Sequence, residues 1–111
     1  MRARGCAAFA LGLALASGLV PAAHAVASDE VGFARATTLA RTGRCPEALA
    51  VLAELAIPTA RSVHLRAQCQ LEAKDWPAAL ASLEEAKRLD PGTPGIALQL
   101  AVARFHMGDY E

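Results

Sequence analysis

The feature that most restricts the fold of this chain is an internal repeat. When the sequence is aligned with itself, residues 74–76 (Lys-Asp-Trp) match residues 108–110 (Gly-Asp-Tyr). A second self-alignment, in which the offset between the two copies of the sequence is slightly shorter, places residues 46–49 (Pro-Glu-Ala-Leu) on residues 77–80 (Pro-Ala-Ala-Leu). Periods of roughly 20–50 residues are typical of proteins built from stacked supersecondary units, because one such unit cannot bury its apolar face alone. The sequence therefore predicts a tandem array of similar units.

Composition and turn residues predict that each unit is a pair of helices. The 111 residues include 27 alanines, the best helix former, and only 5% are aromatic, so strands are not favoured. The first helix, over residues 29–42, has Ser28 or Asp29 as its N-cap and Gly43 as its left-handed stop. Three more helices are predicted to begin at Pro46, Pro77 and Pro94. A further helix is predicted over residues 59–73. We expect an all-α fold of antiparallel helix hairpins.

The N-terminal residues have the pattern of a signal peptide. Arg2 and Arg4 precede the uncharged run of residues 5–20, and Ala23-His24-Ala25 forms a small-x-small cleavage site. The run is short and rich in alanine for a transmembrane helix, so we expect no membrane span after cleavage; the alternative is an uncleaved anchor. The predicted domains are therefore a signal peptide over residues 1–25 and an exported helical domain over residues 26–111.

The two cysteines of the exported segment, Cys45 and Cys69, are predicted to form a disulfide. An even pair in an exported chain meets an oxidising compartment, where disulfides form and persist. The spacing is not that of a CxxC redox motif. Two free, partly buried thiols are the alternative.

Charge and motifs give no sign of nucleic-acid binding or of catalysis. Eleven basic and eleven acidic residues give a formal net charge of 0, so the basic excess that phosphate binding needs is missing. His64 and His106 are far apart in the sequence and have no metal-ligand spacing, and glycine-rich phosphate loops are missing. We therefore expect no enzyme activity, no cofactor, no metal and no nucleic-acid partner.

The repeat resembles the tetratricopeptide repeat (TPR) family. The resemblance rests on a small residue inside the first helix of each unit, a Gly-Asp-Tyr-like turn, an alanine early in the second helix, and a closing Asp-Pro. In this sequence these are Ala36, Ala67 and Ala101; residues 42–45, 73–76 and 107–110; Ala48 and Ala79; and Asp90-Pro91. The resemblance implies a TPR-like α-solenoid of about two and a half repeats, with units at about 29–58, 59–93 and 94–111, the last incomplete.

The resemblance also implies a ligand groove lined by the first helix of each unit. Its side chains would be Phe33, Thr37, Arg41, His64, Gln68, Glu72, Leu98, Val102, Phe105 and His106. The lysine and asparagine set with which some members hold a peptide carboxylate is not at these positions.

The expected function is a protein–protein interaction module, or scaffold, of the bacterial cell envelope or periplasm that binds a peptide or a partner helix. The alternatives are an accessory repeat domain of a larger envelope enzyme encoded beyond Glu111, and a groove for a lipid or pigment. Residues 108–111 repeat a turn that leads into a packed helix in the second unit, so we also expect that the chain continues or that a second copy covers its last helix.

Overall fold

A computed structural model describes residues 22–108 of the chain, and all of its regular structure there is helical. The helices are α2 (Ala22–Arg41), α3 (Cys45–Ala53), α4 (Ala60–Glu72), α5 (Trp76–Leu89) and α6 (Ile96–His106). Residues 22–108 contain no strand, which confirms the predicted all-α class. Most of the predicted signal peptide lies outside the described residues. Among the helices that are described, none is both long and apolar enough to cross a membrane.

Local sequence signals explain where most of these helices begin. Pro46 and Pro77 stand in the first turns of α3 and α5, as predicted. At the start of α4, the Thr59 side chain accepts a hydrogen bond from the Ser62 N–H, and the Ser62 hydroxyl accepts one from the Thr59 N–H. This reciprocal capping box satisfies two backbone donors that have no partner inside the helix.

One aligned residue in each of the three repeated turns has a positive φ. Gly43, Lys74 and Gly108 follow the ends of α2, α4 and α6 and have φ values of 78°, 59° and 81°. Positive φ closes a helix by letting the next N–H groups bond back to its last carbonyls, and it favours glycine. Lys74 adopts it without being glycine, so the second turn carries a backbone cost that the other two avoid.

Two helix starts differ from the prediction. Helix α2 is already helical at Ala22, well before the predicted start, so Asp29 lies inside the helix and is not its N-cap. Its carboxylate instead accepts hydrogen bonds from the N–H groups of Ala56 and Ile57, at 2.9 and 2.7 Å, in the connection between α3 and α4. Helix α6 begins at Ile96 and not at Pro94, because Gly95 has a left-handed conformation that the helix cannot contain.

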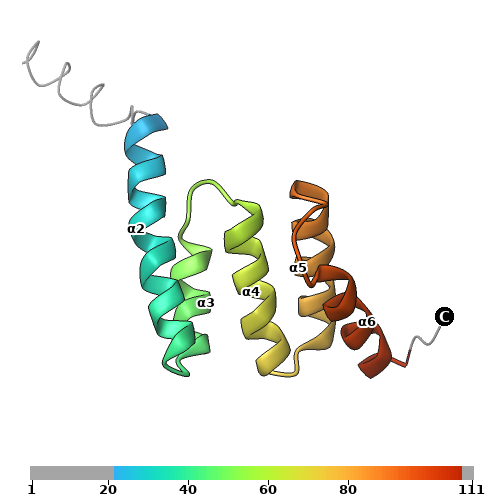
Figure 1. Ribbon diagram of the computed structural model, residues 1–111. Coiled ribbons are helices and arrows are strands. Elements are labelled where there is room, and N and C mark those ends of the chain that lie inside the picture. The colour runs from blue at the N-terminus through green and yellow to red at the C-terminus, as the bar shows by residue number, and fades with distance from the viewer. Residues whose placement is uncertain (1–21, 109–111) are drawn as a thin grey trace, which may run out of the picture.

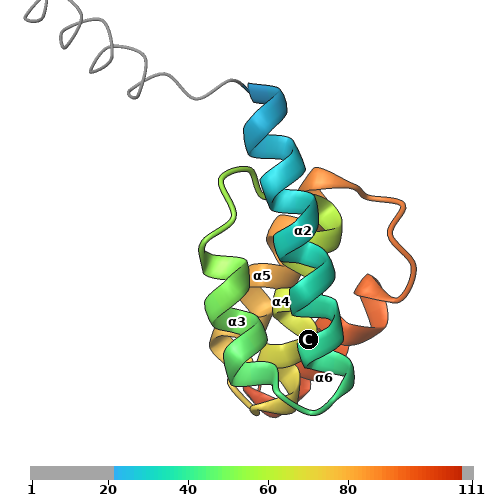
Figure 2. The ribbon, with the colours of Figure 1, turned by 90° about the vertical axis from the view of Figure 1, so that its left-hand side faces the viewer.

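Neighbouring helices in the chain lie side by side. Figure 1 shows α2 and α3 antiparallel, α4 and α5 antiparallel beside them, and α6 against α5. In Figure 2, which views the molecule from the α2 side, α2 and α3 stand in front of the remaining helices. Short connections join α2 to α3 and α4 to α5, which suits antiparallel neighbours.

The buried apolar side chains form two clusters, not one continuous core. The first core, mainly between α2 and α3, consists of Ala36, Leu39, Cys45, Ala48, Leu52 and Cys69. The second core, between α4, α5 and α6, consists of Val63, Ala67, Leu83, Ala86, Ile96, Leu100 and Ala103. Cys69 is the one fully buried α4 residue in the first core. Cys69 and the partly buried Leu65, which packs against the first core, therefore link this core to α4.

The alanines that the repeat aligns behave differently in the last unit. Ala36 and Ala48 are fully buried in the first core, and Ala67 and Ala79 are fully buried between α4 and α5. Ala101 is exposed, whereas the four aligned alanines of the first two units are buried. The reason is geometric: α6 turns Ile96, Leu100 and Ala103 toward its neighbours, and no helix within residues 22–108 covers its other side.

A polar network crosses the interface between α4 and α5. Arg66 Nε donates to the hydroxyl of Ser82 at 3.0 Å, and that hydroxyl donates to Gln70 Oε1 at 2.6 Å. The Arg66 guanidinium also pairs with Glu85 at 2.7 Å. Ser82 is only 3% exposed, so both of its bonds replace bonds to water.

Candidate functional site

The candidate site is a groove between two facing stripes of side chains on α2 and α4. On α2 the stripe is Val26, Glu30, Phe33, Thr37 and Arg41, and on α4 it is Arg61, Leu65, Gln68 and Glu72. Each successive pair has the spacing of one helical turn, so each stripe stays on one side of its helix. We call the line along which the two stripes face each other the seam. Two pockets lie along this seam, and each residue of the stripes lines one of the two pockets.

The lower pocket, near the end of α2 that leads into α3, has a volume of about 270 Å³ and is lined by both polar and apolar groups. Its lining residues are Thr37, Ala40, Arg41, Cys45, Leu65, Gln68, Cys69 and Glu72. Arg41, Gln68 and Glu72 are exposed, and within the described residues Arg41 has no ion-pair partner. The pocket thus offers a cation, an amide and a carboxylate to a ligand.

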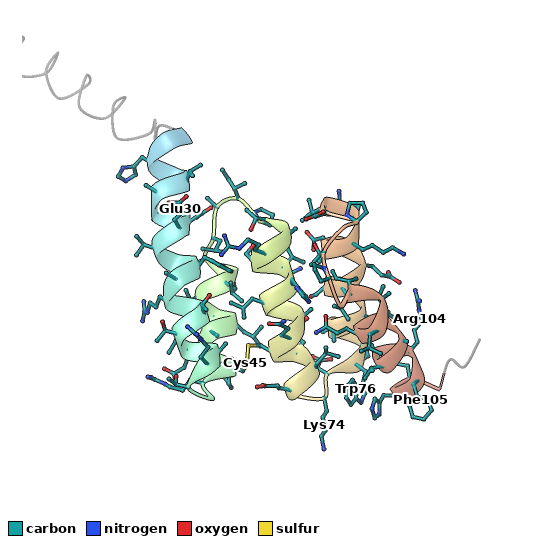
Figure 3. All side chains as sticks on the ribbon, in the orientation of Figure 1. Glu30, Cys45, Lys74, Trp76, Arg104 and Phe105 are labelled. Atoms are coloured by element: carbon teal, nitrogen blue, oxygen red, sulfur yellow. A yellow bond between two sulfur atoms is a disulfide. The ribbon has the colours of Figure 1, made fainter. Side chains whose placement is uncertain are left out.

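A disulfide between Cys45 and Cys69 forms part of the wall of the lower pocket. The two Cα atoms are 5.2 Å apart, which is within the usual range for a bridge. Figure 3 shows the yellow sulfur–sulfur bond beside the Cys45 label, between α3 and α4. An oxygen of Glu72 lies 3.2 Å from Cys45 Sγ. The bridge holds α3 against α4, and both of its cysteines line this pocket.

The upper pocket has a volume of about 220 Å³ and is more apolar. It is lined by Val26, Asp29, Glu30, Phe33, Leu55, Ile57, Thr59, Arg61 and Ser62. The Arg61 guanidinium carbon lies 4.7 Å from the centre of the Phe33 ring, a cation–π contact between the two stripes. Phe33 lines this pocket and Thr37, one helical turn further along, lines the lower pocket, so the two pockets adjoin.

Of the ten predicted groove residues, the structure brings five together along this seam. They are Phe33, Thr37, Arg41, Gln68 and Glu72. His64 lies elsewhere: its Nε2 is 2.6 Å from Oε1 of Gln99, so it joins α4 to α6.

The four predicted groove residues of α6 do not line either pocket. His106 stacks on Trp76 with ring centres 3.9 Å apart, and Phe105 lies edge-on to His106. Figure 3 shows Trp76 and Phe105 together at the lower ends of α5 and α6, away from the disulfide. Leu98 is 70% exposed, and Val102 is also exposed. These side chains form a separate apolar surface on α6.

Sequence reasoning missed most of the upper pocket. Val26 and Glu30 precede Phe33 at helical spacing, and this signal would have extended the stripe once α2 was known to begin before Asp29. Leu55 and Ile57 come from the connection between α3 and α4, and no helical periodicity points to them. They enter the pocket because Asp29 binds the backbone of that connection.

Outside the groove, the hydrogen bond from Arg44 and the charge of that residue lower the pKa of Glu47. Within residues 22–108 no three histidine, cysteine or acidic side chains gather closely enough to hold a metal ion. The groove offers binding groups on two helices.

Comparisons of the chain with family models, curated proteins and solved structures find no match.

Proposed function

We propose that residues 26–111 form an exported TPR-like array whose groove between α2 and α4 binds an extended peptide segment of a partner protein. The repeated positive φ at residues 43, 74 and 108 supports the array, because these three positions also align in sequence. The buried alanines at residues 36, 48, 67 and 79 support it too, since they let paired helices approach closely.

The observation that carries the binding proposal is the pair of adjoining pockets along one seam. From Val26 to Arg41 the α2 stripe rises about 22 Å at 1.5 Å per residue. An extended peptide advances about 3.3 Å per residue, so about six or seven residues would fill the seam. Such a peptide would place apolar side chains in the upper pocket and polar groups against Arg41, Gln68 and Glu72 in the lower one.

The proposal makes the protein an interaction module and not an enzyme. The groove-lining groups supply a cation, an amide and a carboxylate, which can bind and orient a ligand. The N-terminal pattern of Arg2, Arg4 and the Ala23-His24-Ala25 site supports export to a bacterial periplasm or cell envelope. The proposed partner is accordingly a protein of that compartment.

Selection of random dodecapeptides on the immobilised full chain tests the proposal. We expect selected peptides to bind the Arg41→Glu variant at least tenfold more weakly, because the substitution reverses the charge of a residue that has no ion-pair partner within residues 22–108. Arg35→Glu is the matched control, since Arg35 is an exposed arginine of the same helix that lines neither pocket. Equal losses in the two variants would count against the groove, as would a failure to select any peptide.

A further inference from the structure

The upper pocket has features of a preformed site for a single apolar side chain. Val26 and Ile57 are large apolar residues, yet they are 45% and 46% exposed at its edge. Phe33 and Leu55 complete the apolar lining. The volume of about 220 Å³ lies below the roughly 300–1,000 Å³ of sites for drug-sized molecules, so the pocket suits one side chain of a longer ligand.

The walls of this pocket are held in place from more than one side. Asp29 binds the N–H groups of Ala56 and Ile57, which fixes the connection between α3 and α4 to α2. The capping box of Thr59 with Ser62 fixes the other end of that connection to α4. A site that is already formed loses little conformational freedom when a ligand binds.

Gly32 lets one wall approach α2 closely. A Cβ atom at this position would lie 2.8 Å from Cδ2 of Leu55, closer than real Cβ contacts. The missing side chain therefore admits Leu55 against the backbone of α2, where it becomes part of the apolar lining.

The charged side chains at the edge of the upper pocket favour a ligand with a basic group. Both Asp29 oxygens already accept backbone hydrogen bonds, and the Arg61 guanidinium lies over the Phe33 ring. Glu30 is exposed and has no ion-pair partner within the described part of the chain. Figure 3 labels it on the upper half of α2. The carboxylate free to meet a ligand is thus that of Glu30, next to an apolar pocket.

We propose that this pocket anchors a leucine- or phenylalanine-sized side chain of the bound peptide, with a neighbouring lysine or arginine that pairs with Glu30. The inference rests on the proposed peptide-binding function and names the residue class that the peptide must contain. The apolar side chain supplies most of the affinity because it leaves water, and the basic neighbour sets the direction of the peptide along α2.

Three acetylated and amidated tripeptides test the anchor by their effects on backbone amide NMR shifts of the full chain. Ala-Phe-Lys should produce saturable shifts at residues 26–33 and 55–62. Ala-Ala-Lys should bind at least tenfold more weakly, and Ala-Phe-Glu should bind several-fold more weakly at low salt. Equal shifts for all three, or Ala-Phe-Lys shifts confined to α6, would overturn the proposal.

A pair of matched variants distinguishes an effect on the upper pocket from a general effect of an introduced charge. Ile57→Asp places a charge at the pocket edge and should weaken Ala-Phe-Lys binding at least tenfold. Val31→Asp is the control, because Val31 is 72% exposed on α2 and lines neither pocket. Unchanged binding by Ile57→Asp would overturn the proposal, and so would laurate producing the same shifts while the peptides produce none, because the pocket would then be a lipid site.

The same variants distinguish failure of the anchor from failure of the proposed function. If display-selected peptides lose affinity for Arg41→Glu but keep it for Ile57→Asp, the groove binds peptides and the anchor proposal is wrong. If neither substitution affects selected peptides, both proposals are wrong.

Discussion

Removing the Cys45–Cys69 disulfide should destabilise the protein by about 3.5 kcal/mol. The bridge spans a sequence separation of 24 residues, and closing a loop of that length in the unfolded chain lowers its entropy by an amount worth about 3.5 kcal/mol at 25 °C. A domain of this size has a total stability of roughly 5–13 kcal/mol. The bridge therefore contributes a quarter or more of the stability.

Urea unfolding followed by circular dichroism measures this difference. The Cys45→Ala/Cys69→Ala double variant is compared with the oxidised protein, and reduction of the unmodified chain provides the control without a substitution. The two comparisons should agree to within about 1 kcal/mol. A loss below about 1 kcal/mol in both, or two free thiols titrated in the unreduced protein, would refute the reasoning.

The two-core arrangement predicts where the lost stability appears. Cys69 is the one buried α4 residue in the first core, whereas α4, α5 and α6 share the second core. Reduction should therefore speed hydrogen exchange in α2 and α3 more than in α4 and α5. Equal acceleration in all four helices would show that the cores are coupled by contacts other than the bridge.

Three further predictions concern individual residues. Ser82→Ala should cost about 1–2 kcal/mol in thermal unfolding, because it removes a buried hydroxyl that bonds two side chains across α4 and α5; a loss near zero would mean that water replaces it. Lys74→Gly should stabilise by about 1 kcal/mol and Gly43→Ala should destabilise by a similar amount, since both positions have positive φ; equal signs would contradict this. Carbon-13 NMR titration should place the pKa of Glu47 below its ordinary value and Arg44→Ala should raise it. Because the folded-state pKa of Glu47 is lowered, the Arg44–Glu47 pair stabilises the fold above the ordinary carboxyl pKa, and this stabilisation is lost as the pH falls through the lowered pKa. An unchanged Glu47 titration in Arg44→Ala would contradict Arg44 as the cause of the lowered pKa.

The fold class and most turns could be predicted because local signals decide them. Proline in the first turns of α3 and α5 and the glycine after α2 act over a few residues, and the structure agrees with them. The start of α2 could not be predicted, because Asp29 has a side chain suited to capping and instead binds the connection between α3 and α4. That choice depends on tertiary contacts.

The groove could be predicted only in part, for a similar reason. Helical periodicity puts Phe33, Thr37 and Arg41 on one face of α2, and the structure sets Gln68 and Glu72 opposite them. Helix α6 begins after the left-handed Gly95, and no sequence pattern gives its orientation relative to that seam. Its exposed side chains Leu98 and Phe105 lie on another surface. Residues contributed by a connection, such as Leu55 and Ile57, have no periodic signal.

Chemical-shift mapping of a display-selected peptide on the full chain is the most direct test of a peptide-binding groove between α2 and α4. The predicted result is a saturable set of amide shifts confined to residues 26–41 and 55–72, which is lost in Arg41→Glu and kept in Arg35→Glu. Shifts centred on α5, on the exposed side of α6, or spread evenly over residues 22–108 would contradict the proposed site.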